Sequence, residues 1–243
     1  MVKLSERMLH LADMVRQGAV LADVGTDHGY IPIYLVESGR ICRAFAMDIK
    51  EGPLGRAKEH IRAFGLDDYI TVRRSDGVAA LSPGEADTIL IAGMGGDVMR
   101  HILEDGEAVV ASSRELILQP QSKIREVREY LFKKGYEDAG EDMVYEEGKY
   151  YPMMRVLTCG GEAVRKRYAA YGEEKKQMFF CYGEFLIQEK HSVMRQFLKE
   201  QAGVYEGRLS RLDKMRQSDA AKCRRREVLS KLHCVQRALG LME

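Results

Sequence analysis

Three acidic residues that each follow a short apolar run are the side chains in this sequence best placed for chemistry. Asp23 follows residues 19–22, Asp48 follows residues 44–47, and Asp76 comes soon after a third such run. Uninterrupted apolar runs of this length predict buried parallel strands. Because the carboxyl ends of parallel strands line the ligand crevice of an open α/β sheet, we expect the three carboxylates to meet around one ligand.

The turn after Asp23 contains the glycines that such a ligand needs. Gly25 and Gly29 can adopt positive φ and let a ligand approach the main chain, and a helix beginning after Gly29 favours an anionic group. A dinucleotide fingerprint starting at Gly25 requires glycine where Asp27 stands, so a nicotinamide oxidoreductase is disfavoured. The turn is closer to the glycine loop of S-adenosylmethionine enzymes, whose cofactor carries an ammonium and a sulfonium. On this stretch alone, a βα turn that binds nothing is the alternative.

The cofactor's nucleoside accounts for the other two acids. Asp48 ends the second strand about 25 residues beyond Asp23 and is predicted to bind both ribose hydroxyls. Asp76 is predicted to accept a hydrogen bond from the adenine amine. Helix capping by Asp48 and an Asx turn at Asp76 are the alternatives. The predicted cofactor-binding residues are Asp23, Gly25, Thr26, Asp27, His28, Gly29, Asp48, Ile49, Asp76, Gly77, Ala92 and Gly93.

A fourth apolar run, residues 87–92, leads directly into a segment with almost no side chains. Gly93, Met94, Gly95 and a further glycine form a floor that lets a flat base reach main-chain groups. We predict that this loop contacts a target base, although a methionine filling a core gap is the alternative for Met94. Asp27 is the remaining catalytic candidate, because it can hold the cofactor ammonium or steady a cationic product.

Composition restricts the remaining classes of protein. The 243 residues are 45% hydrophobic and 31% charged, as expected for a globular protein of one or two domains. The five cysteines form no CxxC pair and the histidines show no ligand spacing, so we expect a reducing cytoplasm and no metal. No run approaches the ~20 apolar residues of a membrane span, and the charged N-terminus is unlike a signal peptide.

The pattern of elements predicts two domains. Residues 5–16 read as an amphipathic helix capped by Ser5. Strands then alternate with helices five times, the fifth strand being residues 115–118, before a hairpin over residues 137–158 closes the sheet. We therefore expect a doubly wound α/β sheet in residues 1–160. In residues 161–243, apolar positions recur at threes and fours on both sides of a polar break at 217–219. This spacing predicts two long helices packed antiparallel as a coiled coil.

Charge is divided unevenly between these domains. Residues 1–159 contain 20 Lys and Arg against 26 Asp and Glu, whereas residues 160–243 contain 18 against 11. A basic extension on an acidic domain suits a polyanionic partner, although solvated helix faces give the same excess. Tyr30 and Tyr151 are further candidates for stacking on a base. The predicted nucleic-acid contacts are Arg73, Arg74, Lys123, Arg125, Arg128, Tyr150, Lys222, Arg224, Arg225 and Arg226.

Five motifs together resemble the bacterial tRNA (adenine(22)-N1)-methyltransferase family known as TrmK. They are Asp23–Tyr30 (DVGTDHGY), Asp48–Leu54 (DIKEGPL), Ser75–Gly77 (SDG), Ile91–Gly96 (IAGMGG) and Leu118–Pro120 (LQP). The resemblance implies a class I methyltransferase (Rossmann-like) domain, a coiled-coil C-terminal domain, S-adenosyl-L-methionine as donor, and methylation at N1 of adenine 22 in tRNA. We expect a cytoplasmic monomer or weak homodimer with tRNA as partner.

Two other functions fit the same residues. The first is a methyltransferase acting on another RNA, a small molecule or a protein, with the coiled coil serving only to dimerise. The second is a non-catalytic RNA-binding protein that keeps a methyltransferase shell.

Overall fold

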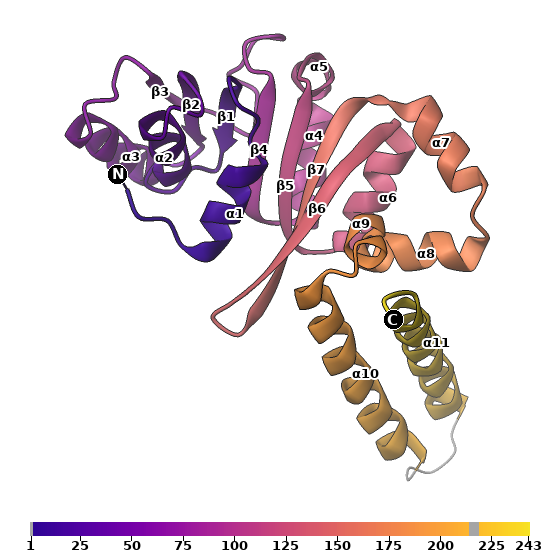
Figure 1. Cartoon of the computed structure of the whole chain (residues 1–243). Coiled ribbons are helices and arrows are strands. Elements are labelled where there is room, and N and C mark those ends of the chain that lie inside the picture. Colours follow the sequence, from indigo (N-terminus) through magenta and orange to yellow (C-terminus); the bar gives the residue numbers. More distant parts are fainter. Residues whose placement is uncertain (1, 214–218) are drawn as a thin grey trace. The chain divides into compact units, whose positions relative to one another are not determined.

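The computed structural model describes residues 2–213 and 219–243, and its contacts divide the chain into two compact units, residues 1–167 and 168–243 (Figure 1). The sequence predicted a boundary at 160/161, seven residues earlier. The helix α7 (Gly161–Ala169) explains the shift, because Val164 is buried and Gly161 packs against the backbone of Gly135. The amino-acid composition thus becomes basic after residue 160, whereas the first compact unit continues to residue 167.

A seven-stranded sheet forms the centre of the first unit. Its strand order is β3-β2-β1-β4-β5-β7-β6, with the first five strands parallel and the last two antiparallel to their neighbours. This order confirms the predicted doubly wound sheet closed by a hairpin. The strands are β1 (Val20–Val24), β2 (Arg43–Asp48), β3 (Ile70–Arg74), β4 (Thr88–Gly95), β5 (Glu115–Ser122), β6 (Tyr136–Glu146) and β7 (Lys149–Gly160).

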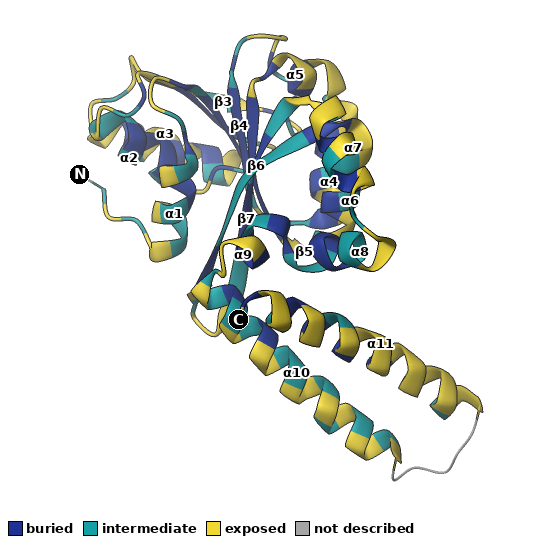
Figure 2. Cartoon of the chain, turned by 45° about the vertical axis from the view of Figure 1, so that its right-hand side comes forward, coloured by how far each residue is buried: buried dark blue, intermediate teal, exposed yellow. Residues whose placement is uncertain are grey.

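Helices cover both faces of this sheet. Leu21 of β1 belongs to a core cluster with residues of α1, α2 and α3, whereas Ala22 belongs to a second cluster with residues of α4, α5 and α6. Successive strand residues point to opposite faces, which is why the central parallel strands are largely apolar, whereas the edge strand β3 contains two arginines. Figure 2 shows the resulting buried sheet between exposed helix surfaces. The helices are α1 (Glu6–Met14), α2 (Tyr30–Glu37), α3 (Glu51–Ala63), α4 (Gly96–Asp105), α5 (Glu107–Ser112) and α6 (Ile124–Lys134).

Two strands continue further than the sequence indicated. β4 extends to Gly95 and β5 runs through Pro120 to Ser122, whereas we expected ends at Ala92 and Leu118. The pairing tolerates Pro120 because its register shifts at this point, as in a β-bulge. Both extensions lie at the carboxyl edge, so they add walls to the predicted crevice.

The second unit consists of α8 (Glu173–Tyr182), α9 (Glu184–Gln188), α10 (Ser192–Asp213) and α11 (Asp219–Leu241). The antiparallel pairing of the two long helices is confirmed, because Arg225 contacts Asp213 near one end and Arg195 donates to the Met242 carbonyl at the other. Gln217 and Ser218 of the predicted polar break lie outside the described residues. No helix in the described ranges is long and apolar enough to cross a membrane.

Candidate functional site

The three predicted acids lie at one edge of the sheet, at the ends of adjacent strands. Asp23 is the penultimate residue of β1, Asp48 ends β2, and Asp76 follows β3 by two residues. Main-chain hydrogen bonds hold these ends together, since the Gly25 amide donates to the Met47 carbonyl over 2.8 Å. The three-strand arrangement β3-β2-β1 therefore brings together residues that are far apart in sequence.

Asp23 is the buried member of the set, with 7% of its surface exposed. Burial, helped by repulsion from the nearby Asp48, raises the pKa of Asp23 to about 6, and the Thr26 hydroxyl acts in the opposite direction. A low-dielectric setting disfavours the charged carboxylate. A positively charged group bound beside Asp23 would restore that charge.

Asp48 lies at the predicted strand end and does not cap α3, because Lys50 is the N-cap and no side chain caps this helix. One oxygen of Asp48 accepts a 2.7 Å hydrogen bond from the amide of Lys50, the residue that caps α3. The next side chain, Ile49, is 50% exposed although it is apolar, which suits contact with a flat ring. Asp76 is exposed beside Gly77, whose φ of +53° and proximity to Ile102 leave no room for a side chain.

The turn after β1 adopts the glycine conformations that the sequence predicted. Gly25 and Gly29 have φ of +75° and +69°, and Gly29 is the N-cap of α2. His28 also has positive φ and stacks on Tyr30 with ring centroids 5.1 Å apart. The His60 ring of α3 stacks on both of them, which fixes the outer side of the turn.

Asp27 projects from the same turn with 64% of its side chain exposed. Its carboxylate lies 3.4 Å from Arg56 of α3 and 3.4 Å from the His28 ring. The carboxylate thus faces basic groups of the protein as well as the cavity described below. A contact between Asp27 and a ligand stays a prediction.

The glycine floor at the end of β4 faces the β1 turn. Gly93 has φ of +76°, and its amide donates to the side-chain oxygen of Gln119 over 3.2 Å. Met94 packs at the margin of the core, and a Cβ on Gly25 would lie 2.2 Å from the Met94 methyl group. The packing alternative therefore describes what Met94 does in this structure, and its contact with a base stays a prediction.

A cavity of about 280 Å³ opens between these elements. Asp23, Gly25, Asp27, Ala92 and Gly93 line it as the sequence predicted, together with three residues of α1, Ile31 of α2 and Gln121 of β5. Asp48 and Asp76 are not among its lining residues, so their meeting with Asp23 around one ligand stays a prediction. Sequence reasoning brought together the strand ends but missed the α1 wall and Gln121. The residues that line the cavity are Arg7, Met8, Leu11, Asp23, Gly25, Asp27, Ile31, Ala92, Gly93 and Gln121.

Arg7 is the cation that α1 adds to this cavity. Its guanidinium donates to the side-chain oxygen of Gln119 over 3.1 Å, pairs with Glu146, and lies 5.2 Å above the Tyr151 ring. Nothing in the periodicity of residues 5–16 distinguishes Arg7 from an ordinary surface arginine. Only the folding of α1 against the β6–β7 hairpin places it at the cavity.

Two arginines predicted to bind nucleic acid are engaged by acidic residues of the protein itself. Arg128 is buried, with 5% of its side chain exposed, and pairs with Glu141 over 2.7 Å. Arg73 binds Glu85 through two nitrogens, lies over the Phe45 ring, and holds the pKa of Glu85 down at about 2. The prediction of a surface role is wrong for Arg128, because an enclosed and neutralised guanidinium is not presented to a phosphate. Arg73 keeps 27% of its side chain exposed, so its contact with nucleic acid stays a prediction.

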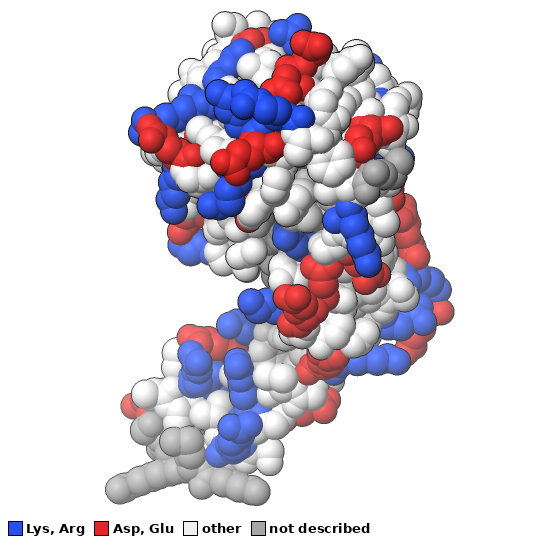
Figure 3. All heavy atoms as spheres, turned by 90° about the vertical axis from the view of Figure 1, so that its left-hand side faces the viewer, with Lys and Arg blue, Asp and Glu red and all other residues white. Residues whose placement is uncertain are grey.

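The other predicted contacts of the first unit are exposed but paired. Arg74 forms an ion pair with Glu51, Lys123 with Asp97, and Arg125 with Glu129. Figure 3 shows the same mixture of basic and acidic side chains over the face it displays. Salt-screened surface pairs of this kind can exchange partners at little cost.

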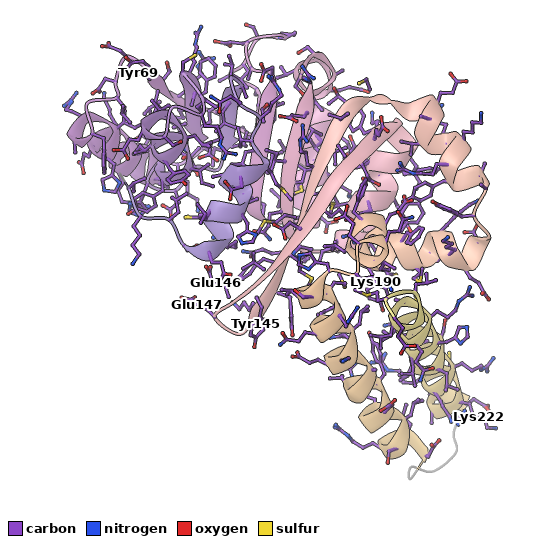
Figure 4. The ribbon with its side chains drawn as sticks, in the orientation of Figure 1. Tyr69, Tyr145, Glu146, Glu147, Lys190 and Lys222 are labelled. Atoms are coloured by element: carbon purple, nitrogen blue, oxygen red, sulfur yellow. The ribbon has the colours of Figure 1, made fainter. Side chains whose placement is uncertain are left out.

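Tyr150 lies near the tip of the β6–β7 hairpin. Its ring centroid is 4.6 Å from that of Tyr145, and Tyr145 is 44% exposed. Figure 4 labels Tyr145 beside Glu146 and Glu147 at this tip. The hairpin thus offers aromatic surface, and stacking by Tyr150 on a base stays a prediction.

The basic residues of α11 differ in how they are paired. Lys222 lies 3.6 Å from Asp219, Arg224 lies 3.5 Å from Glu227, and Arg225 lies 2.8 Å from Asp213. Arg226 is exposed and forms no ion pair with any residue in the described ranges. Within those same ranges, no group of three or more His, Cys, Asp or Glu side chains is arranged to hold a metal ion.

Comparisons with known proteins agree with this geometry. A family model described as a methyltransferase domain matches residues 4–154. The chain is 39% identical over 199 residues to the tRNA (adenine(22)-N(1))-methyltransferase of Bacillus subtilis, covering 82% of this chain and 80% of that protein.

Solved structures give the same answer over nearly the whole chain. The crystal structure of the Bacillus subtilis m1A22 tRNA methyltransferase TrmK matches with a TM-score of 0.85 and 30% identity, covering 98% of this chain and 100% of that one. Streptococcus pneumoniae Sp1610 in complex with S-adenosyl-L-methionine matches with a TM-score of 0.82 and 31% identity, with the same coverage.

Proposed function

The chain belongs to the tRNA (adenine(22)-N1)-methyltransferase family, and from this premise we propose that it transfers a methyl group from S-adenosyl-L-methionine to N1 of adenine 22 in tRNA. The observation that carries the proposal is the cavity between the β1 turn and the Gly93 floor. Buried and exposed acids line one side of it and a nearly bare glycine segment lines the other. A cationic cofactor and a flat base are the two ligands that these sides accept.

The residues present fit the cofactor. Asp23 and Asp27 provide the negative charge that its ammonium and sulfonium require, and Arg7 provides a cation for its carboxylate. Asp48 at the end of β2 would hold the ribose hydroxyls, and the exposed Ile49 and Asp76 would contact the adenine. When bound, the cofactor supplies a methyl carbon made electrophilic by a positively charged sulfur.

The protein then contributes mainly position and a water-poor setting. Adenine N1 has its own lone pair once the base leaves its pairing, so the site needs no strong general base. The Gly93 loop would bring the base close to main-chain groups, because Gly93 and Gly95 have no side chains of their own. Asp27 lines the cavity, where its carboxylate would favour the positive charge that the adenine gains.

The substrate side rests on exposed basic groups and on access to the base. Adenine 22 must leave its stack to enter the cavity. We propose that Arg74, Lys123 and Arg125, together with the basic residues of α11, contact tRNA phosphates, which are recognised by shape and charge. We also propose a cytoplasmic location. We further propose that the chain is a monomer or weak homodimer, and light scattering would measure this oligomeric state.

Incubation of the chain with the cofactor and a tRNA transcript tests the proposal directly. Mapping of methylated nucleosides by mass spectrometry is expected to find 1-methyladenosine at position 22. A transcript carrying guanosine at that position is the matched control and should stay unmodified. Methylation elsewhere in the transcript, or binding of tRNA without methylation, would support one of the two alternative functions.

A further inference from the structure

Gln121 is a polar residue of the cavity wall whose side chain forms no hydrogen bond within the described residues. Asp27 faces Arg56 and His28, and Arg7 is held by Gln119 and Glu146. Gln121 is exposed at the end of β5 and makes no side-chain hydrogen bond to any residue between 2 and 213 or between 219 and 243. Its carboxamide is therefore available to a ligand.

The neighbouring glutamine shows what an occupied carboxamide looks like in the same strand. Gln119 is fully buried, and its oxygen accepts from Arg7 over 3.1 Å and from the Gly93 amide over 3.2 Å. Its nitrogen donates to the Pro120 carbonyl over 3.3 Å. Gln119 thus links α1 to the Gly93 segment through hydrogen bonds, whereas the Gln121 side chain makes no such link within the described residues.

An irregularity in the pairing of β4 with β5 presents Gln121 at the floor. Ala92 pairs with Gln119, Met94 with Pro120 and Gly95 with Ser122, so Gly93 and Gln121 are both left without a partner in the register. The Gln121 nitrogen lies 3.8 Å from the position that a Cβ on Gly93 would occupy. Bulges next to active sites commonly redirect a side chain in this way.

A primary carboxamide offers one acceptor and one donor in a plane. Glutamine uses both on adenine, accepting from the N6 amine and donating to N7. This pairing leaves N1 free, which is the atom that must attack the methyl carbon. Guanine presents two acceptors on the same edge, so the oxygen of the carboxamide would face O6 unfavourably.

We propose that Gln121 recognises the target adenine through N6 and N7 and so positions N1 for methylation, an inference that rests on the proposed function. As N1 gains the methyl group the ring becomes cationic and its N6–H groups become stronger donors. The hydrogen bond to the Gln121 oxygen then strengthens during the reaction, which favours the transition state over the bound substrate.

Transcripts with 7-deazaadenosine at position 22 test this contact, because they lack N7 but keep N1 and N6. For the unaltered chain we expect kcat/KM to fall about fivefold with this substitution. Gln121→Ala is expected to lower kcat/KM on adenosine about 20-fold and to show no further loss with 7-deazaadenosine. Gln121→Glu, which keeps an acceptor but not the donor, should lose less on adenosine and also ignore the 7-deaza change.

The inference would be overturned if Gln121→Ala kept full activity. It would also be overturned if the losses in kcat/KM from Gln121→Ala and from 7-deazaadenosine multiplied when the two changes were combined. Cofactor affinity measured by calorimetry should stay unchanged in both variants, because Gln121 is assigned to the base and not to the cofactor. Gln17→Ala is the matched control, since Gln17 is an exposed glutamine that binds the Gly39 carbonyl away from the cavity. Absence of methylation at position 22 by the unaltered chain would instead be a failure of the proposed function.

Discussion

The carboxyl edge of the sheet and the long helix pair α10–α11 both carry many charged residues but hold them differently. At the sheet edge, Asp23 is buried and has a raised pKa, and Arg128 is enclosed with Glu141. Along the helix pair, a narrow line of buried residues such as Leu198 and Val235 lies beneath charges that are mostly exposed. Figure 2 shows this contrast between the buried strands and the exposed helices.

The contrast teaches that the same residue type has different uses in the two regions. A charge removed from water changes its pKa or requires a fixed partner, so it acts on one defined neighbour. An exposed charge is screened and exchanges partners, so it acts collectively on a polyanion. Four experiments test this difference, beginning with the largest expected effect.

Arg128→Ala tests whether a basic residue near the sheet serves structure alone. It leaves the Glu141 carboxylate buried without this partner, so we expect the free energy of unfolding to fall by about 3–5 kcal/mol. Urea denaturation measures the loss. Arg125→Ala is the control on the same helix, because its exposed pair with Glu129 should change stability by less than about 0.5 kcal/mol. Similar values for the two variants would contradict the distinction.

Asp48→Ala tests the strand-end acids as cofactor ligands. Loss of two charge-assisted hydrogen bonds to the ribose is expected to weaken cofactor binding about 100-fold, as measured by calorimetry. Asp68→Ala provides a comparison, because Asp68 is an exposed acid before β3, at the opposite edge of the sheet. An unchanged dissociation constant for Asp48→Ala would remove Asp48 from the site.

The pH dependence of cofactor binding tests the buried carboxyl group of Asp23. Its pKa of about 6 lies above the usual value, so the group is protonated at pH 5 and ionised at pH 7.5. Only the ionised form attracts the cofactor's ammonium, so we expect affinity to fall about tenfold from pH 7.5 to pH 5. In Asp23→Asn this dependence should disappear. Stronger binding at pH 5 would reverse the assigned sign.

Arg226→Ala tests the exposed charges of α11. Because Arg226 has no acidic partner among the described residues, we expect tRNA affinity to fall about threefold and the salt slope to decrease by about 0.7–0.9. Filter binding between low and moderate salt measures both values. Arg225→Ala should have a smaller effect, since Arg225 is paired with Asp213. Identical salt slopes for Arg226→Ala and the unaltered chain would exclude a phosphate contact.

Much of the fold followed from apolar periodicity. The central parallel strands were predictable because a strand buried on both faces is largely apolar, and the two long helices because their apolar residues recur at threes and fours. The boundaries were less predictable, because the extension of β4 and β5 past Ala92 and Leu118 depends on a shift in their pairing. Strand pairing between distant segments leaves no mark on local composition.

The sequence by itself determined which strand ends carry acids and glycines, and hence that Asp23, Asp48 and Gly93 belong to one edge. That inference needs only the alternation of strands and helices, which the chain encodes locally. Tertiary structure alone decided that Arg7 and Gln121 reach the cavity, that Arg128 is buried and that Arg73 is engaged by Glu85. The reason is physical: a side chain's partner is set by distance and burial in the folded protein, and these do not depend on its neighbours along the chain.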